Sequence, residues 1–271
     1  MTVRAMSSID IAMWDAAGKT VGVPLYKLLG GYRDRVPAYL AGGYYVEGKG
    51  LDELAEEMRG KVAAGARYVK MKIAGARMSE DVERVRVVRE AIGPEVELMV
   101  DANNAYSTLE AIRTARRIED LDIYWFEEPV HAEDYAGLAK VQANTPIPIA
   151  TGENEYTRYG FRDLIDCGGA DILQPDANVL GGITEFRHVA SLAGAYRLPL
   201  APHGSALLHV HLVSGISNGL IVESVVTEGQ GRKGIFKTAL VLDEEGMVSP
   251  PEGPGLGIGL DEEFLRTHFV T

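Results

Sequence analysis

Residues Glu97–Glu127 read ELMVDANNAYSTLEAIRTARRIEDLDIYWFE, and this stretch indicates the fold. Two short apolar runs, Glu97–Asp101 and Ile123–Glu127, each end in an acidic residue. Between them, Ser107-Thr-Leu-Glu110 has the pattern of a capping box, in which two side chains satisfy backbone N–H groups at the start of a helix. Short apolar runs bounded by loop residues are typical of buried parallel strands. The stretch therefore predicts a strand, a helix and a second strand.

The same unit repeats from about residue 36 to about residue 225. Six further apolar runs are predicted as strands: Pro37–Leu40, Tyr68–Ile73, Ile147–Gly152, Asp171–Gln174, Leu198–Pro202 and Leu220–Glu223. The other predicted helices are Leu51–Ala64, Asp81–Ala91, Asp134–Val141, Tyr159–Asp166 and Thr184–Ala195. Eight strands with helices between them favour an α/β barrel of the TIM type over an open doubly wound sheet.

The composition excludes several classes of protein. The chain has 271 residues and a formal net charge of -12, and a nucleic-acid-binding surface would instead be basic. No apolar run is long enough to span a membrane, and the N-terminus is predicted to form an amphipathic helix instead of a signal peptide. Cys167 is the single cysteine, which excludes an internal disulfide and fits a cytoplasmic location.

Ionisable residues recur at or just after the ends of the predicted strands, about one β-α unit apart. They are Lys70, Lys72, Asp101, Glu127, Glu153, Asp176, His203 and Glu223. Active sites of TIM-type barrels lie at the carboxyl ends of the strands, so we expect these side chains to share one site.

Three of these residues predict a metal site. Asp101, Glu127 and Glu153 follow three consecutive strands, and converging carboxylates repel each other unless a cation neutralises them. Mg²⁺ binds a few carboxylates and keeps positions for water and substrate. The alternative is that each acid caps the helix that follows it.

The remaining residues predict proton transfer. Lys70 and Lys72 are two positions apart on one strand, so they share a face, and each is expected to lower the pKa of the other. The alternative is a pair of solvent-facing lysines on an edge strand. His203 follows the strand after the one that ends near Asp176. If the two side chains meet, the Asp176 carboxylate would fix the tautomer of His203 and raise its basicity. Glu223 is expected to be a protonated hydrogen-bond donor in a dry pocket, or else part of a salt bridge.

Neighbouring residues are given supporting roles. Asn103 and Glu128 adjoin the predicted metal ligands, and we expect them either to support those ligands or to contact substrate. The other histidines are predicted to be structural: His131, His188, His209, His211 and His268.

Seven ordered motifs resemble the enolase superfamily, in its mandelate racemase subgroup. They are Val69-Lys-Met-Lys72, Val100-Asp-Ala-Asn103, Trp125-Phe-Glu-Glu-Pro129, Thr151-Gly-Glu-Asn154, Gln174-Pro-Asp176, Pro202-His-Gly204 and Val222-Glu-Ser224. The resemblance implies a (β/α)7β barrel over residues 32–228. It also implies that residues 1–31 are the end of an N-terminal capping domain with an approach helix, and that residues 229–271 form a closing segment.

The resemblance assigns roles to the matched positions. Asp101, Glu127 and Glu153 would bind Mg²⁺. Lys72 would be the base on one face of a carboxylate substrate, and His203, paired with Asp176, the acid or base on the opposite face. The resemblance also implies that Lys70 and Glu223 contact the substrate near its carboxylate.

The implied reaction is removal of the proton next to a carboxylate through an enediolate intermediate. Dehydration of an aldonate or aldarate to a 2-keto-3-deoxy acid is favoured. A racemase or epimerase of a 2-hydroxy acid and an inactive, truncated metal-binding barrel remain alternatives. A cycloisomerase is less favoured, because such enzymes usually carry a lysine on the sixth strand. Members of the subgroup often assemble, so a homo-oligomer is expected.

Overall fold

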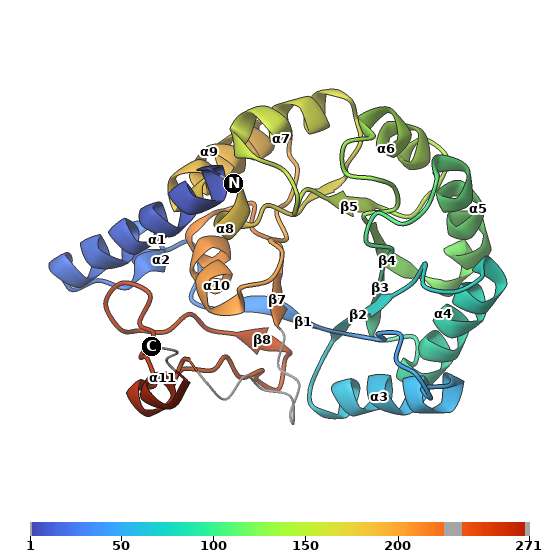
Figure 1. Ribbon diagram of the computed structural model, residues 1–271, viewed down its shortest axis with the longest axis horizontal. Coiled ribbons are helices and arrows are strands. Elements are labelled where there is room, and N and C mark those ends of the chain that lie inside the picture. Colours follow the sequence, from blue (N-terminus) through green and yellow to red (C-terminus); the bar gives the residue numbers. More distant parts are fainter. Residues whose placement is uncertain (1, 225–234, 269–271) are drawn as a thin grey trace.

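The computed structural model describes residues 2–224 and 235–268, and its centre is a curled parallel sheet (Figure 1). Seven strands follow one another in the spatial order β6-β5-β4-β3-β2-β1-β7. Their bounds are β1 Val36–Gly42, β2 Tyr68–Lys72, β3 Glu97–Asp101, β4 Ile123–Glu127, β5 Ile149–Thr151, β6 Ile172–Leu173 and β7 Val222–Ser224. The predicted TIM-type barrel is confirmed, and the bounds of β3 and β4 agree with the predicted runs.

The barrel closes through residues around Leu200, which lies in the predicted strand Leu198–Pro202. Leu200 forms isolated parallel bridges with Leu173 of β6 on one side and with Gly219 on the other. This segment is not a regular strand. Pro199 and Pro202 have no N–H group to donate, so the ladder cannot extend past the bridge.

Helices surround the sheet on its outer face (Figure 1). They are α3 Leu51–Ala63, α4 Met78–Ile92, α5 Thr108–Ile118, α6 Tyr135–Gln142, α7 Thr157–Asp166, α8 Ala177–Leu180, α9 Gly182–Ala195 and α10 Ala206–Gly215, with a 3-10 turn η1 at Glu119–Leu121. The predicted capping box is present, because Ser107 Oγ accepts the Glu110 N–H and the Glu110 carboxylate accepts the Ser107 N–H. Helix α10 was not predicted. It is apolar on nearly all sides and buried, so its sequence lacks the one-sided pattern of a surface helix.

Alternation along the strands separates two apolar layers. On β3, Leu98 and Val100 join the large core between the sheet and the helices, whereas Met99 belongs to a smaller cluster that fills the barrel. The inner cluster also holds Tyr39 and Trp125, whose rings pack edge to face with centroids 5.4 Å apart. The period of two that turns Met99 inward also turns Asp101 inward, at the carboxyl end of the strand.

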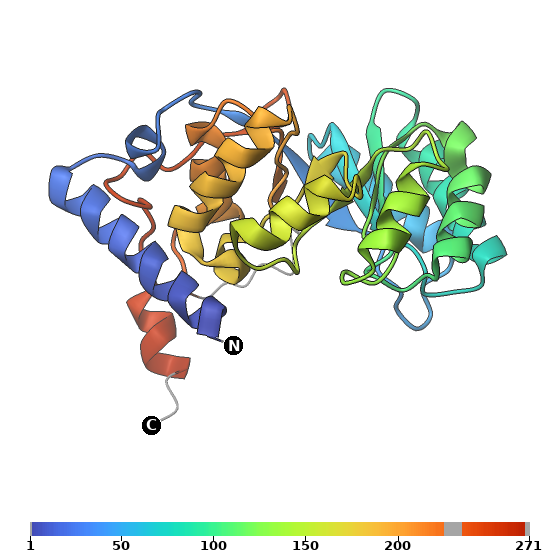
Figure 2. The same cartoon turned by 90° about the horizontal axis from the view of Figure 1, so that it is seen from above.

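The N-terminal segment packs on the outside of the barrel. Helix α1 (Thr2–Val21) lies against α8 and α9, and α2 (Leu25–Leu28) against α10 (Figure 2). The Asp10 carboxylate accepts the backbone N–H of Thr184 at 2.9 Å, which fixes α1 to the start of α9.

Part of the predicted closing segment is described. Strand β8 (Met247–Val248) pairs antiparallel with the start of β1, and α11 spans Glu262–His268. Residues 229–234 and 269–271 of that segment lie outside the described residues. Across the described ranges, no helix has both the length and the apolar character needed to cross a membrane.

Candidate active site

The carboxyl ends of β2, β3 and β4 bring charged side chains into register. Lys72 is the pairing partner of Asp101, and Asp101 is the partner of Glu127. Glu153 follows two residues after β5, and Glu223 lies within β7. The predicted residues therefore gather at one end of the barrel, as their spacing indicated.

Lys70 lies at the centre of this group and is fully buried. Its Nζ lies 2.5 Å from Glu127 Oε1, 3.4 Å from Glu223 Oε1 and 3.5 Å from Asp101 Oδ2. Burial alone would lower the pKa of Lys70, but the surrounding carboxylates outweigh it and hold the pKa well above its usual value. The prediction that the neighbouring lysine lowers this pKa was wrong, because the carboxylates lie closer to the ammonium group.

Lys72 lies nearer the mouth of the site. Its side chain is 18% exposed, and its Nζ donates to Asp101 Oδ2 at 2.5 Å and to Asn103 Oδ1 at 2.6 Å. Asn103 also donates its backbone N–H to Asp101 Oδ1 at 2.8 Å. The Tyr44 ring lies at the same mouth, with its centroid 5.9 Å from the Lys72 ammonium. Lys72 is thus the lysine of the pair that a small molecule can reach.

Glu127 is held from both sides. One oxygen contacts Lys70, and the other accepts hydrogen bonds from Trp125 Nε1 at 3.0 Å and Gln174 Nε2 at 2.7 Å. Burial, reinforced by the charge of Asp101, raises the pKa of Glu127 to about 8. Sequence reasoning assigned no role to Trp125 or to Gln174. Each was visible in a quoted motif, two residues before a predicted site residue.

The carboxylates show an excess of buried negative charge. Burial raises the pKa of Glu153, and its Oε2 is buried without a hydrogen-bond partner in the described part of the chain. Within residues 2–224 and 235–268, no three acidic, histidine or cysteine side chains converge closely enough to hold a metal ion. The three predicted metal ligands therefore share one end of the barrel but are not arranged around a common point. Two of them form ion pairs instead, Glu127 with Lys70 and Asp101 with Lys72.

The donor chemistry nevertheless fits a hard dication. Asp101, Glu127 and Glu153 supply carboxylate oxygens from adjacent strand ends, which is the ligand type that Mg²⁺ prefers. Glu153 Oε2 lacks a hydrogen-bond partner among the described residues, and the pKa values of Glu127 and Glu153 are raised, so more positive charge can be accommodated here.

The predicted pairing of His203 with Asp176 is present. His203 Nδ1 lies 3.4 Å from Asp176 Oδ2, while Nε2 lies 3.4 Å from Glu153 Oε2 and 4.0 Å from Glu223 Oε2. Burial alone would lower the pKa of His203, but these three carboxylates raise it to about 9. Asp176 is also buried, yet its hydrogen bonds with His203 and Asn178 lower its pKa to about 2. The arrangement favours an imidazolium beside ionised Asp176.

Glu223 differs from the prediction of a protonated donor. Its Oε2 accepts the backbone N–H of Gly204 at 2.7 Å, and its Oε1 lies beside Lys70. Burial would raise the pKa of Glu223, but Lys70, His203 and the Gly204 N–H lower it. The protonated-donor prediction was therefore wrong, and the salt-bridge alternative describes this residue.

Glu128 lies behind the site. It is fully buried, and its two oxygens accept the side-chain amides of Asn104 at 2.6 Å and Asn154 at 2.8 Å. Burial, with the nearby charge of Glu153, raises the pKa of Glu128 to about 7. Glu128 therefore links the loops after β3, β4 and β5.

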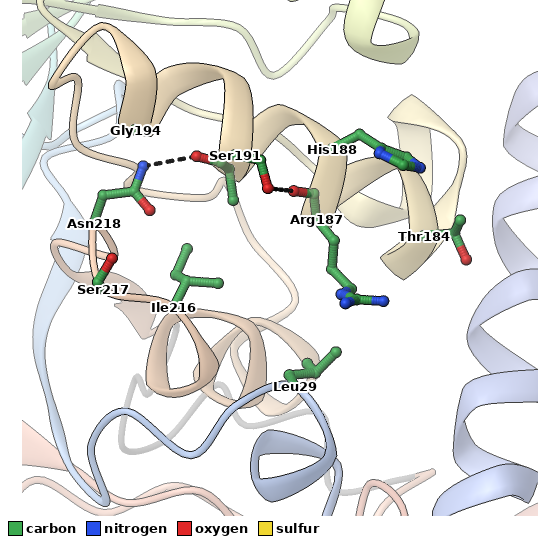
Figure 3. Close-up of a pocket in the computed structure, with 10 residues that line it drawn as sticks. Leu29, Thr184, Arg187, His188, Ser191, Gly194, Ile216, Ser217 and Asn218 are labelled. Atoms are coloured by element: carbon green, nitrogen blue, oxygen red, sulfur yellow. Dashed lines mark hydrogen bonds between the residues drawn. The ribbon is translucent and has the colours of Figure 1, made fainter.

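A cavity of about 660 Å³ lies beside α9 (Figure 3). Arg187 and Ser191 of α9 line it, together with Leu29 and Ile216 (Figure 3). None of the predicted site residues lines this cavity. The convergence of charged side chains at the strand ends, and not the size of the cavity, locates the candidate active site.

Two family profiles match the chain. The profile described as enolase C-terminal domain-like matches residues 53–264. The profile described as the mandelate racemase and muconate lactonizing enzyme N-terminal domain matches residues 1–30.

Characterised relatives and solved structures agree with these matches. The chain is 37% identical to arabinonate dehydratase of Saccharolobus solfataricus, over 97% of this chain and 73% of that protein. It is 38% identical to 3,6-anhydro-alpha-L-galactonate cycloisomerase of Streptomyces coelicolor, over 96% of this chain and 71% of that protein. A crystal structure of a racemase from Streptomyces coelicolor A3(2) with bound magnesium has a TM-score of 0.90 and 34% identity, covering 97% of this chain and 72% of that one.

Proposed function

The chain belongs to the enolase superfamily, in its mandelate racemase and muconate lactonizing enzyme family, and from that membership we propose that it is a Mg²⁺-dependent lyase that dehydrates a sugar acid to a 2-keto-3-deoxy acid. Its relatives support the lyase class, because they include arabinonate, L-talarate/galactarate and D-galactonate dehydratases. The particular acid differs among these relatives, so the substrate is proposed only as an aldonate or aldarate.

Asp101, Glu127 and Glu153 are the proposed metal ligands. Two similar solved structures contain magnesium, and the oxygen donors here suit the same ion. When bound, Mg²⁺ supplies Lewis-acid stabilisation of the negative charge that develops on the substrate carboxylate. Lys70 adds a fixed positive charge beside Glu127 and Glu223, which we propose lies next to the same carboxylate.

Lys72 is the proposed base. It lies at the mouth of the site, where its Nζ, as the neutral amine, can take the proton from the carbon next to the carboxylate. The electron pair of that C–H bond moves towards the carboxylate and gives the enediolate. Its return forms a C=C bond to the adjacent carbon as the C–O bond of the hydroxyl there breaks. The resulting enol then tautomerises to the 2-keto acid.

His203 is the proposed acid, and its place beside Asp176 and Glu153, at a different strand end from Lys72, is the observation that carries the proposal. A pKa of about 9 keeps this imidazole protonated near neutral pH, ready to donate a proton to the leaving hydroxyl, which departs as water. Dehydration uses one base and one acid together. Lys72 from β2 and His203 from the loop before α10 meet that need, with separate carboxylate partners at Asp101 and Asp176.

A racemase or epimerase is the second candidate. The presence of proton-transfer groups on two separate elements favours it, and one similar structure is described as a racemase. That reaction requires Lys72 and His203 each to accept a proton in one direction and to donate it in the other.

A panel of aldonic and aldaric acids, incubated with the enzyme and Mg²⁺, tests the proposal. Formation of a 2-keto acid is expected for at least one acid and is expected to be lost in Lys72→Met and His203→Asn, with His211→Asn as a folded control. Loss of optical rotation without keto acid would establish the racemase instead. Failure to convert any acid by either route would contradict the proposed function.

A further inference from the structure

The buried ring of His209 joins the two loops that carry the proposed acid and its partner. His209 lies on α10 and has no exposed surface. Its Nε2 accepts the backbone N–H of Ala177 at 3.1 Å, and its Nδ1 lies 2.6 Å from the carbonyl oxygen of Gly204. Ala177 directly follows Asp176, and Gly204 directly follows His203. One imidazole thus spans both members of the pair.

The hydrogen bonds fix the state of this ring. A backbone N–H can only donate, so Nε2 of His209 must be the acceptor and the ring proton must lie on Nδ1, facing Gly204. A second proton on Nε2 would point at the Ala177 N–H, and burial also lowers the pKa of His209. Phe186 of α9 stacks on the ring, with centroids 6.3 Å apart and planes 24° apart. The ring is therefore a neutral, oriented bridge.

The backbone around His203 needs such a bridge. Gly204 has φ +59° and Ser205 has φ +42°, so two consecutive residues after His203 are left-handed. This conformation is unfavourable for a residue with a side chain, and it turns the chain sharply from the strand end into α10. The Gly204 carbonyl that accepts from His209 lies inside this turn, and the Gly204 N–H donates to Glu223.

We propose that His209 is a positioning residue that holds His203 at hydrogen-bonding distance from Asp176. This proposal deepens the proposed function, since it assigns a support to the acid of that reaction. His203 and Asp176 lie on separate loops, and their direct contact is long, at 3.4 Å. The two shorter bonds through His209 join the loops at the backbone, beside the side-chain link from Asp176 through Asn178 to Ser205. His209 does not touch the substrate and is not a catalytic residue.

Three substitutions separate the two bonds. His209→Phe keeps an aromatic ring but removes both bonds. His209→Asn can still donate to Gly204 from the position of Nδ1, and His209→Gln can still accept from Ala177 at the position of Nε2. His211, two residues further along α10, provides the control. It is also buried with two hydrogen bonds, but these go to Tyr26 and Leu256, away from the site.

The kinetic arm uses the acid identified by the panel. His209→Phe is expected to lower kcat by about 10- to 100-fold with little change in KM, as is common when a group that orients a functional side chain is lost. His209→Asn should restore most of the rate, because it keeps the bond nearest His203. His211→Phe and His211→Asn should leave kcat unchanged. Equal losses for the His209 and His211 variants would show a purely structural role and overturn the proposal.

A spectroscopic arm decides the proposal without turnover. Protein labelled with ¹⁵N-histidine gives the His203 Nδ1 signal, which is assigned by its absence in His203→Asn. At a fixed pH, His209→Phe is expected to move this signal to that of an imidazole free of Asp176, while His211→Phe leaves it in place. An unchanged His203 signal in folded His209→Phe would overturn the positioning role. If the wild type converts no acid, the proposed function fails while this arm still decides the role of His209.

Discussion

His211 gives a quantitative prediction for the dependence of stability on pH. Its ring is buried between α2 and the C-terminal segment, where Nδ1 accepts the Tyr26 N–H at 3.3 Å and Nε2 donates to the Leu256 carbonyl at 3.0 Å. Burial lowers the pKa of His211 from 6.5 to about 4. The folded protein therefore favours the neutral ring, and the stability that this provides is complete only above pH 6.5, the pKa of the unfolded chain.

The size of the effect follows from the two pKa values. As pH falls from 6.5 towards 4, His211 binds a proton in the unfolded chain but not in the folded protein. Each tenfold difference in proton affinity is worth about 1.4 kcal/mol, so the full loss below pH 4 is about 3 kcal/mol, with about 2 kcal/mol already lost at pH 5.

Urea unfolding followed by tryptophan fluorescence measures this loss when wild type and His211→Gln are compared from pH 7.5 to pH 5. Glutamine keeps a donor for Leu256 and does not titrate. At pH 7.5 the variant should be the less stable protein, because the Tyr26 N–H loses its acceptor. The difference should shrink by about 2 kcal/mol at pH 5. Parallel stability curves across this range would refute the reasoning, since they would show that His211 titrates alike in both states.

Three further predictions concern the site and the helices. Lys72→Met should lower kcat by about 10²- to 10⁴-fold in steady-state assays, as expected for loss of a general base, while its urea midpoint stays close to that of wild type; retention of the rate would exclude Lys72 as the base. Glu128→Gln should lower the free energy of unfolding by about 1–3 kcal/mol in urea, because the glutamine amide cannot accept from both Asn104 and Asn154; an unchanged stability would show that these bonds contribute little. Gly60→Ala should stabilise the protein by about 0.5–1 kcal/mol on thermal unfolding, since Gly60 is exposed within α3 and an added Cβ meets no atom within 4 Å; a destabilised variant would contradict this.

Local patterns were enough to predict much of the barrel. The bounds of β3 and β4 followed from apolar runs that stop at Asp101 and Glu127, where buried strands meet the site. The predicted strand Leu198–Pro202 lies at the expected place in the barrel, next to β6. In the structure it is not a regular strand, because its two prolines interrupt the ladder. Helix α10 was missed, since a helix buried on all sides has no amphipathic period.

The location of the site could be predicted from sequence better than its electrostatics. The recurrence of charged residues at strand ends predicted that Lys70, Asp101 and Glu127 lie close together, and the structure shows that they do. Their pKa values depend on which charges lie nearest, and sequence spacing does not contain that information. The neighbouring lysine suggested a lowered pKa for Lys70, whereas three surrounding carboxylates raise it. The sequence predicts only a structural role for His209, because its contacts with Ala177 and Gly204 arise only in the folded chain.

A crystal grown or soaked with Mn²⁺ in place of Mg²⁺, and measured for anomalous scattering, tests the metal-dependent mechanism most directly. The account predicts one peak at the barrel mouth, with oxygens of Asp101, Glu127 and Glu153 all within about 2.0–2.3 Å of it, and with Lys72 and His203 on opposite sides of the adjoining space. A peak elsewhere, one that lacks any of these three ligands, or Lys72 and His203 on the same side, would contradict it.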